Sequence, residues 1–123
     1  MRENPYRRSA ALFRSLAHPG RLQILDELRR AEACVCHLQT VLRRPQSYVS
    51  QQLRVLREMG IVTDSRDGLN VFYQLSNPQV ERLLTEVLGP ANGPMRLSNC
   101  PCPSCRGACQ TERDEELVER AAA

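Results

Sequence analysis

Apolar residues recur every three or four positions in five stretches of the chain, a spacing that predicts amphipathic helices. The first stretch ends at a His18-Pro19-Gly20 break, and the fourth ends before Gly60, because glycine commonly terminates helices. Ser47 is the expected cap of the fourth helix, and Asn77 is expected to open the fifth. The predicted helices cover residues 6–17, 21–30, 34–42, 47–59 and 77–88.

The hydrophobic pattern becomes β-like after the fourth helix. Residues 61–63 and 70–75 are rich in β-branched and aromatic side chains, and the segment 64–68 between them ends in an Asp-Gly turn signal. This order of elements predicts a winged helix-turn-helix, which is a mainly α fold with a β-hairpin wing. The short third helix, a tight turn and the fourth helix form the helix-turn-helix, and the hairpin forms the wing. A chain of 123 residues buries one modest core, so we expect one domain at 1–88 and a tail at 89–123.

Charge is unevenly distributed along the chain. The formal net charge is +3, all basic side chains are arginines, and residues 1–60 hold 11 of them against 5 acids. Arginine suits bidentate contacts with phosphate and guanine, so a basic first half is compatible with a nucleic-acid partner. No apolar run reaches the roughly 20 residues of a membrane span, and the start lacks a signal-peptide core. We therefore expect a cytoplasmic protein with no membrane partner.

The fourth predicted helix carries polar side chains suited to reading DNA. With Val49, Leu53 and Leu56 facing the core, its outer face holds amide, hydroxyl and guanidinium groups that can pair with adenine, guanine or phosphate. Arg66 near the hairpin tip is the expected second contact, to phosphate or the minor groove. The candidate DNA-binding residues are Gln46, Ser47, Tyr48, Ser50, Gln51, Arg54 and Arg66.

Six cysteines form two clusters, and in a cytoplasmic protein they indicate thiolate chemistry rather than disulfides. Thiolates select soft or borderline ions such as As(III), Cd, Pb and Hg. Cys34 and Cys36 are placed inside the third predicted helix, where positions two apart diverge by about 200°. Both cysteines can then bind one ion only if the first turn of this helix is distorted. That distortion would itself move the fourth helix, which is the one expected to read DNA.

The second cluster holds four cysteines within ten residues, at Cys100, Cys102, Cys105 and Cys109. Two arrangements remain open. Tail cysteines can join Cys34 and Cys36, within one chain or across a dimer, in a three-sulfur site suited to As(III), Pb or Cd. Alternatively, the tail closes its own four-sulfur structural zinc site.

Three motifs resemble the ArsR/SmtB family of metalloregulatory repressors: Leu16-Ala17-His18-Pro19-Gly20-Arg21-Leu22, the run from Ser47 to Arg57, and Arg66-Asp67-Gly68-Leu69-Asn70-Val71-Phe72-Tyr73. Together with Cys34-Val35-Cys36-His37-Leu38 they form a pattern that matches the family over roughly residues 8 to 88. The resemblance implies a homodimeric repressor that binds operator DNA and releases it when metal binds, so that 1–88 would serve both DNA binding and dimerisation. His37 stands where relatives with this cysteine pair carry an acid, and the last helix lacks the Asp and His of the zinc-sensing members.

Other functions are compatible with parts of the sequence. A thiol-based redox or persulfide-sensing repressor of the same fold would use the same cysteines. No triad or phosphate-binding loop indicates an enzyme. A metal-carrying chaperone would require that operator binding fail. We expect His37 to be a surface or hydrogen-bonded residue more often than a metal ligand.

Overall fold

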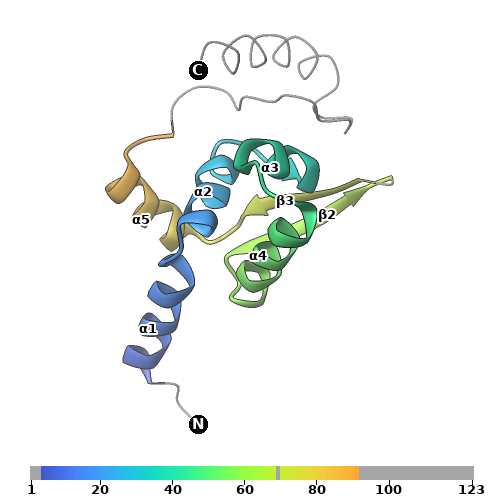
Figure 1. The fold of residues 1–123 in the computed structure, drawn as a ribbon. Coiled ribbons are helices and arrows are strands. Elements are labelled where there is room, and N and C mark those ends of the chain that lie inside the picture. Colours follow the sequence, from blue (N-terminus) through green and yellow to red (C-terminus); the bar gives the residue numbers. More distant parts are fainter. Residues whose placement is uncertain (1–3, 69, 92–123) are drawn as a thin grey trace.

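A computed structural model describes residues 4–68 and 70–91. In this part of the chain the fold is mainly helical with one small sheet, as expected from the hydrophobic pattern. The elements are α1 (Pro5–Leu16), α2 (Pro19–Leu28), β1 (Ala33–Cys34), α3 (Val35–Leu42), α4 (Gln46–Glu58), β2 (Val62–Asp67), β3 (Asn70–Leu75) and α5 (Pro78–Leu88). The helix-turn-helix is α3 and α4, and the hairpin β2–β3 projects from the body as the wing (Figure 1).

Three helices begin with the same local chemistry. The side chains of Asn4, His18 and Asn77 accept hydrogen bonds from backbone N–H groups in the first turns of α1, α2 and α5. A proline follows each of them, where its fixed φ suits the helix and its missing N–H costs nothing. The expected cap at Ser47 is wrong, because α4 already begins at Gln46 and has no side-chain cap.

The core forms between α2, α3, α4 and the base of the sheet. The stripe predicted for α4 is confirmed, since Val49, Leu53 and Leu56 are buried. They pack against Ile24 and Leu25 of α2, both completely buried, within one apolar cluster. Full burial of a side chain of this size contributes about 1.5–3 kcal/mol. This packing sets the position of α4 and therefore of the surface it presents.

The sheet contains a strand that the hydrophobic pattern does not reveal. Its order is β1-β3-β2, with both pairs antiparallel. β1 has only two residues, Ala33 opposite Tyr73 and Cys34 opposite Phe72. The predicted turn was also too long, because β2 continues through Asp64 and Arg66 to Asp67. The first cysteine of the Cys-x-Cys pair therefore belongs to the same sheet as the wing.

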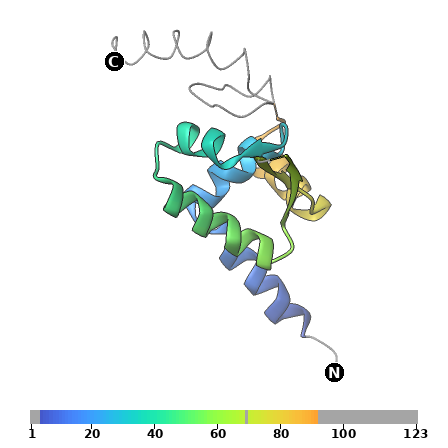
Figure 2. The same ribbon diagram turned by 90° about the vertical axis from the view of Figure 1, so that its right-hand side faces the viewer.

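α1 extends away from the rest of the described chain in both views (Figures 1 and 2). Its outer side chains Tyr6 and Phe13 are 83% and 57% exposed, although Leu16 at its end is buried. At the end of α5, Val87 and Leu88 are 74% and 45% exposed. Both helices thus leave apolar side chains outside the core of a single chain. Within residues 4–68 and 70–91, no helix is long and apolar enough to cross a membrane.

Candidate nucleic-acid interface and thiol pair

The outer face of α4 carries the side chains expected to read DNA. Gln46, Ser47, Gln51 and Arg54 are exposed, and Ser50 is half-buried. α3 and α4 are joined by a turn in which Arg43 takes a left-handed conformation, with φ 56°. That turn holds α4 against α3 and leaves the polar face of α4 uncovered (Figure 2). The exposed face is compatible with the predicted role.

Tyr48 is placed differently from the other candidates on α4. It is half-buried and faces the start of α2, where a Cβ on residue 20 would overlap its hydroxyl oxygen. Its ring lies 6.4 Å from that of His18, centroid to centroid, and the Arg44 guanidinium carbon lies 4.9 Å above it. Gly20 is therefore needed for space rather than for backbone freedom. Tyr48 belongs to the joint between α2 and α4 as well as to the edge of the candidate DNA surface.

Arg21 reinforces this joint from the core side. Its Nε donates to Oε1 of the buried Gln52 of α4 at 2.8 Å, and its Nη1 donates to the carbonyl of Ser15 in α1 at 3.2 Å. One guanidinium thus connects three helices. Because a partly buried charge costs stability unless its donors are satisfied, these bonds hold α4 in one orientation.

An exposed ion pair connects the wing to α4. Arg57 Nη1 of α4 lies 3.6 Å from Asp64 Oδ1 of β2. An exposed pair of this kind contributes about 0–1 kcal/mol, so it orients the wing only weakly. Arg66, the expected wing contact, is exposed on β2 opposite Val71. The sheet therefore sets the position of Arg66 more than this ion pair does.

Cys34 and Cys36 lie side by side. Their sulfur atoms are 3.5 Å apart, with Cys34 buried and Cys36 half-buried. Cys34 is the N-cap of α3 and has extended backbone angles, φ −89° and ψ 169°. The prediction that both residues lie inside a helix is therefore wrong. Because Cys34 is extended, the two side chains converge without any distortion of the first turn of α3.

The sulfur pair fits the ligand geometry of a thiophilic ion. Two sulfurs bound at about 2.3 Å to one tetrahedral ion are about 3.8 Å apart. The separation of 3.5 Å is close to this value, so little rearrangement is needed to bring both sulfurs onto one ion. Within residues 4–68 and 70–91, no group of three or more potential ligands comes together. Cys100, Cys102, Cys105 and Cys109 lie outside the described residues.

His37, the residue after Cys36, lies in the core. Its side chain is 1% exposed, and its Nε2 lies 3.2 Å from Glu27 Oε2 of α2. Its Nδ1 is buried and has no hydrogen-bond partner among the described residues. The expectation of a hydrogen-bonded histidine is met, with the ring inside the protein rather than at the surface. The Glu27–His37 contact fixes α3 against α2 immediately beside the thiol pair.

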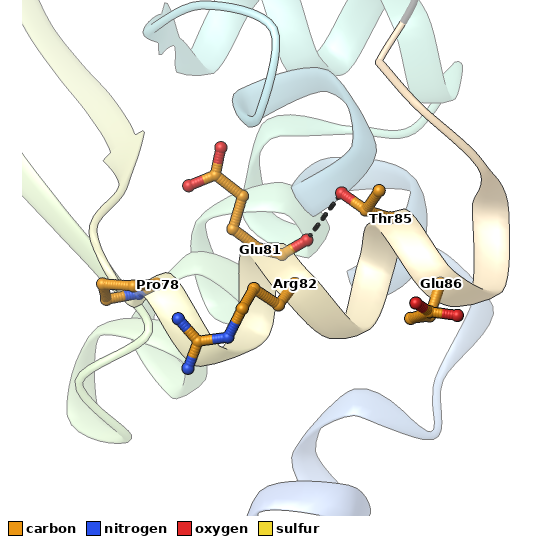
Figure 3. A pocket seen from close by; sticks show the side chains of 5 residues that line it. All are labelled: Pro78, Glu81, Arg82, Thr85 and Glu86. Atoms are coloured by element: carbon orange, nitrogen blue, oxygen red, sulfur yellow. Dashed lines mark hydrogen bonds between the residues drawn. The ribbon is translucent and has the colours of Figure 1, made fainter.

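The outer face of α5 has a shallow depression of about 440 Å³. Its lining side chains all come from this one helix and fan outward rather than converge: Pro78, Glu81, Arg82, Thr85 and Glu86 (Figure 3). Thr85 Oγ1 donates to the carbonyl of Glu81. The two glutamates stand on either side of an arginine, and α5 offers no histidine or aspartate. This face has no thiol or imidazole ligand for a metal.

Comparison with known proteins relates the chain to bacterial regulators. The family model described as bacterial regulatory protein, arsR family, matches residues 18–64. A transcriptional repressor SmtB homolog from Synechocystis is 42% identical over 78 residues, covering 63% of this chain and 59% of the relative. The transcriptional repressor PagR of Bacillus anthracis is 38% identical over 82 residues, covering 66% of this chain and 81% of that protein.

A solved structure shows the same architecture. The homodimeric winged helix-turn-helix DNA-binding domain Mb0332 from Mycobacterium bovis aligns with a TM-score of 0.63 at 30% identity. The alignment covers 68% of this chain and 77% of that domain. The chain thus has the winged helix-turn-helix fold, although it spans only 59% of the length of the Synechocystis relative.

Proposed function

Because the chain belongs to the arsR family of bacterial regulatory proteins, whose members regulate rather than catalyse, we propose that it is a cytoplasmic transcriptional repressor released from DNA by thiophilic ions. It binds operator double-stranded DNA as a homodimer. Residues 1–88 form the DNA-binding and dimerisation domain, and residues 89–123 form a Cys-rich metal-binding tail. The observation that carries the sensing part of this proposal is the contact between the Cys34 and Cys36 sulfurs at 3.5 Å.

The DNA part of the proposal rests on two exposed elements. Gln51 and Arg54 on α4 supply bidentate donors and acceptors for base edges in the major groove. Arg66 on the wing supplies a cation for the adjacent phosphates or the minor groove. Gln46, Ser47, Tyr48 and Ser50 complete the proposed interface.

The homodimer is supported by the apolar side chains that a single chain leaves exposed. Their burial stabilises the protein only if another surface covers them. These side chains are Tyr6 and Phe13 on α1 and Val87 and Leu88 on α5. A second copy presents the same side chains, as a two-fold interface requires. Two subunits also place two copies of α4 on successive half-sites of an operator.

The thiol pair has two routes to the DNA-binding surface. Cys36 lies in the first turn of α3, which packs against α4. Cys34 lies in β1, whose partner β3 is one strand of the wing. Drawing both sulfurs onto one ion therefore acts on the start of α3 and on the wing together. Release follows because the ion-bound arrangement fits the operator less well, a differential affinity rather than a helix distortion.

The identity of the ion follows from its ligands. Two thiolates leave a soft ion under-coordinated, so one or two of Cys100, Cys102, Cys105 and Cys109 complete the site. A three-sulfur site favours As(III), with Cd, Pb or Hg as further effectors. Tail cysteines that remain outside this site can hold structural Zn.

A titration of the apoprotein on its own upstream DNA tests the proposal. As(III), Cd, Pb, Hg, Cu(I) and Zn are added in turn to a preformed complex, and retention is read by mobility shift. We expect As(III), Cd, Pb and Hg to release the protein from the DNA. Failure to bind the upstream DNA would contradict the repressor assignment, and binding that no ion weakens would contradict the sensing assignment.

The same sulfur contact favours one alternative, a redox or persulfide-sensing repressor. A peroxide would oxidise the Cys34 and Cys36 thiols to a disulfide, taking two electrons and two protons and being reduced to water. Thiol titration before and after peroxide, set beside operator retention, separates the two functions. Release by peroxide with loss of two thiols, and no release by ions, would favour the alternative.

A further inference from the structure

Arg44 is an exposed arginine in the turn that joins α3 to α4, and its backbone is fixed on both sides. The residue before it, Arg43, has a left-handed φ of 56°. The residue after it is Pro45, the N-cap of α4, and a proline steers the preceding residue toward extended angles. The Arg44 N–H also donates to the carbonyl of Gln39 in α3 at 3.3 Å. The Arg44 side chain therefore leaves the backbone at a defined place, at the start of α4.

The Arg44 guanidinium is held over an aromatic ring. Its central carbon lies 4.9 Å from the centroid of the Tyr48 ring, within the distance of about 6 Å at which the face of a ring attracts a cation. Tyr48 is itself fixed in place, because its hydroxyl lies against α2 at Gly20. A guanidinium stacked on a ring keeps the N–H donors along its edge available. The protein thus positions this cation without using up its hydrogen-bond donors.

The charge of Arg44 is not neutralised within the described part of the chain. Arg29, Arg30 and Arg57 form ion pairs with carboxylates. Arg44 forms none with any carboxylate of the described residues, and the first turn of α4 contains no acidic residue. Figure 2 shows the turn between α3 and α4 at the outer edge of the described chain. An exposed cation that is held in place but not paired is suited to an anion supplied by another molecule.

We propose that Arg44 is a contact to the DNA backbone: its guanidinium, held by the Tyr48 ring, binds a phosphate beside the groove that α4 enters. This inference rests on the proposed function and adds to its interface a residue that the sequence pattern did not single out. It also makes Tyr48 a positioning residue, which acts through its ring on Arg44.

The place of Arg44 along the chain favours a phosphate over a base. Arg44 comes three residues before Ser47 and seven before Gln51, both of which are exposed near the start of α4. In a helix-turn-helix the first residues of the second helix contact base edges. Contacts to the flanking phosphates fix the register of that helix on the duplex. Arg44 precedes α4 and is held back against Tyr48, so it lies on the side of the phosphates rather than of the base edges.

Holding the side chain in advance raises the affinity that one contact can supply. Ordering a long side chain during binding lowers affinity by about twofold to tenfold. The ring of Tyr48 imposes this order on Arg44 before DNA arrives. One phosphate contact releases about one counterion, which corresponds to about fivefold in affinity at roughly 0.15 M salt. Loss of the ring should therefore cancel much of what Arg44 contributes.

Removal of the Arg44 side chain tests the phosphate contact. Arg44→Ala is compared with wild type in the full-length protein by fluorescence anisotropy at several salt concentrations. The probes are a duplex from the protein's own upstream DNA and a scrambled duplex of the same length. We expect binding to both duplexes to weaken about fivefold near 0.15 M salt, and the slope of log affinity against log salt concentration to fall by about 1. Arg82→Ala, which removes an exposed arginine from α5, is the charge-matched control and should leave the slope unchanged.

The role of the ring is tested by repeating Arg44→Ala in two Tyr48 backgrounds. Tyr48→Phe keeps the ring, so the loss caused by Arg44→Ala should stay near fivefold. Tyr48→Leu removes the ring, and the loss should fall to about twofold or less. Each comparison is made within one background, so any effect of the Tyr48 substitution on the joint with α2 cancels. Urea unfolding checks that every variant is folded.

Four results would overturn these assignments. A salt slope unchanged by Arg44→Ala would exclude the phosphate contact even if affinity fell, because a structural role releases no counterion. A loss confined to the upstream duplex would indicate a base contact instead. Equal losses in the Tyr48→Phe and Tyr48→Leu backgrounds would exclude the positioning role of the ring. Wild type that binds neither duplex would overturn the proposed function itself, whereas wild-type binding that Arg44→Ala leaves unchanged would overturn only this inference.

Discussion

Cys34 lies directly opposite Phe72 in the antiparallel ladder between β1 and β3, and Phe72 in turn lies opposite Ser65 of β2. One sulfur ligand of the proposed site and the strand that carries Arg66 are therefore separated by a single strand. Hydrogen-bonded strands move together more readily than loops do. The wing is thus a direct neighbour of the thiol pair, although the two are far apart in sequence.

Arg66→Ala should weaken operator binding and also shrink the effect of the ion. If Arg66 contacts phosphate, its loss lowers the slope of log affinity against log salt concentration by about 1. The ion-induced loss of affinity should also fall, because one of the two elements that the thiol pair can displace no longer contributes to binding. Fluorescence anisotropy at several salt concentrations measures both effects. An unchanged salt slope would remove Arg66 from the interface.

Gln51→Ala with Arg54→Ala should abolish operator retention while leaving the dimer intact. Each bidentate base contact discriminates by about 1–3 kcal/mol, so losing two brings binding close to the nonspecific level. Mobility shift measures retention, and size-exclusion chromatography checks the dimer. Gln79→Ala, an exposed glutamine on α5, is the matched control. Operator affinity equal to that of the control would rule out α4 as the reading helix.

Gly20→Ala should destabilise the protein and displace the recognition helix. A Cβ at this position overlaps the Tyr48 hydroxyl, and overpacking of this kind costs about 1–3 kcal/mol. Tyr48→Phe removes the hydroxyl, so the double variant should recover part of the loss in unfolding free energy. Denaturant unfolding measures the cycle. Additive losses would show that Tyr48 does not occupy the space beside Gly20.

Glu27→Ala should cost about 1–3 kcal/mol of unfolding free energy, because it leaves the buried His37 ring without the one partner it has among the described residues. Replacing both residues by leucine should recover much of this loss, since the imidazole of His37 is then no longer buried without its partner. Thermal or urea unfolding measures both variants. Equal stability of Glu27→Ala and wild type would contradict a structural role for the pair.

The elements with strong local signals were predictable from sequence. The stripe of Val49, Leu53 and Leu56 is confirmed as buried, and Gly60, with φ 73°, follows α4 as expected. A two-residue strand such as Ala33–Cys34 has no periodicity of its own, since it exists only because β3 lies beside it. In that strand Cys34 has an extended backbone, so its side chain lies beside that of Cys36. The divergence predicted for two cysteines inside one helix therefore does not occur.

The side-chain contacts that organise the candidate site were beyond sequence reasoning for a related reason. Arg29 of α2 donates a hydrogen bond to the carbonyl of Gly89, which follows α5 and is 60 residues away in sequence, and nothing in the charge pattern pairs these two residues. His37 was expected as a surface or hydrogen-bonded residue, but its burial depends on how α3 lies against α2. The helical wheel of α4 predicts that Tyr48 is exposed. In the structure its hydroxyl occupies a space beside α2 that is open because residue 20 is a glycine. Each of these contacts is set by packing between elements.

The central claim is that an ion bound by Cys34 and Cys36 lowers the affinity of the protein for operator DNA, and one measurement tests it most directly. Operator affinity is measured by fluorescence anisotropy with and without saturating As(III) or Cd²⁺, for wild type and for the C34S/C36S variant. We predict that the ions lower the affinity of wild type at least tenfold, which corresponds to a coupling free energy of about 1.4 kcal/mol. The variant should bind the operator with the affinity of wild type, and the ions should not change that affinity. An equal response in both proteins, or none in wild type, would contradict the account.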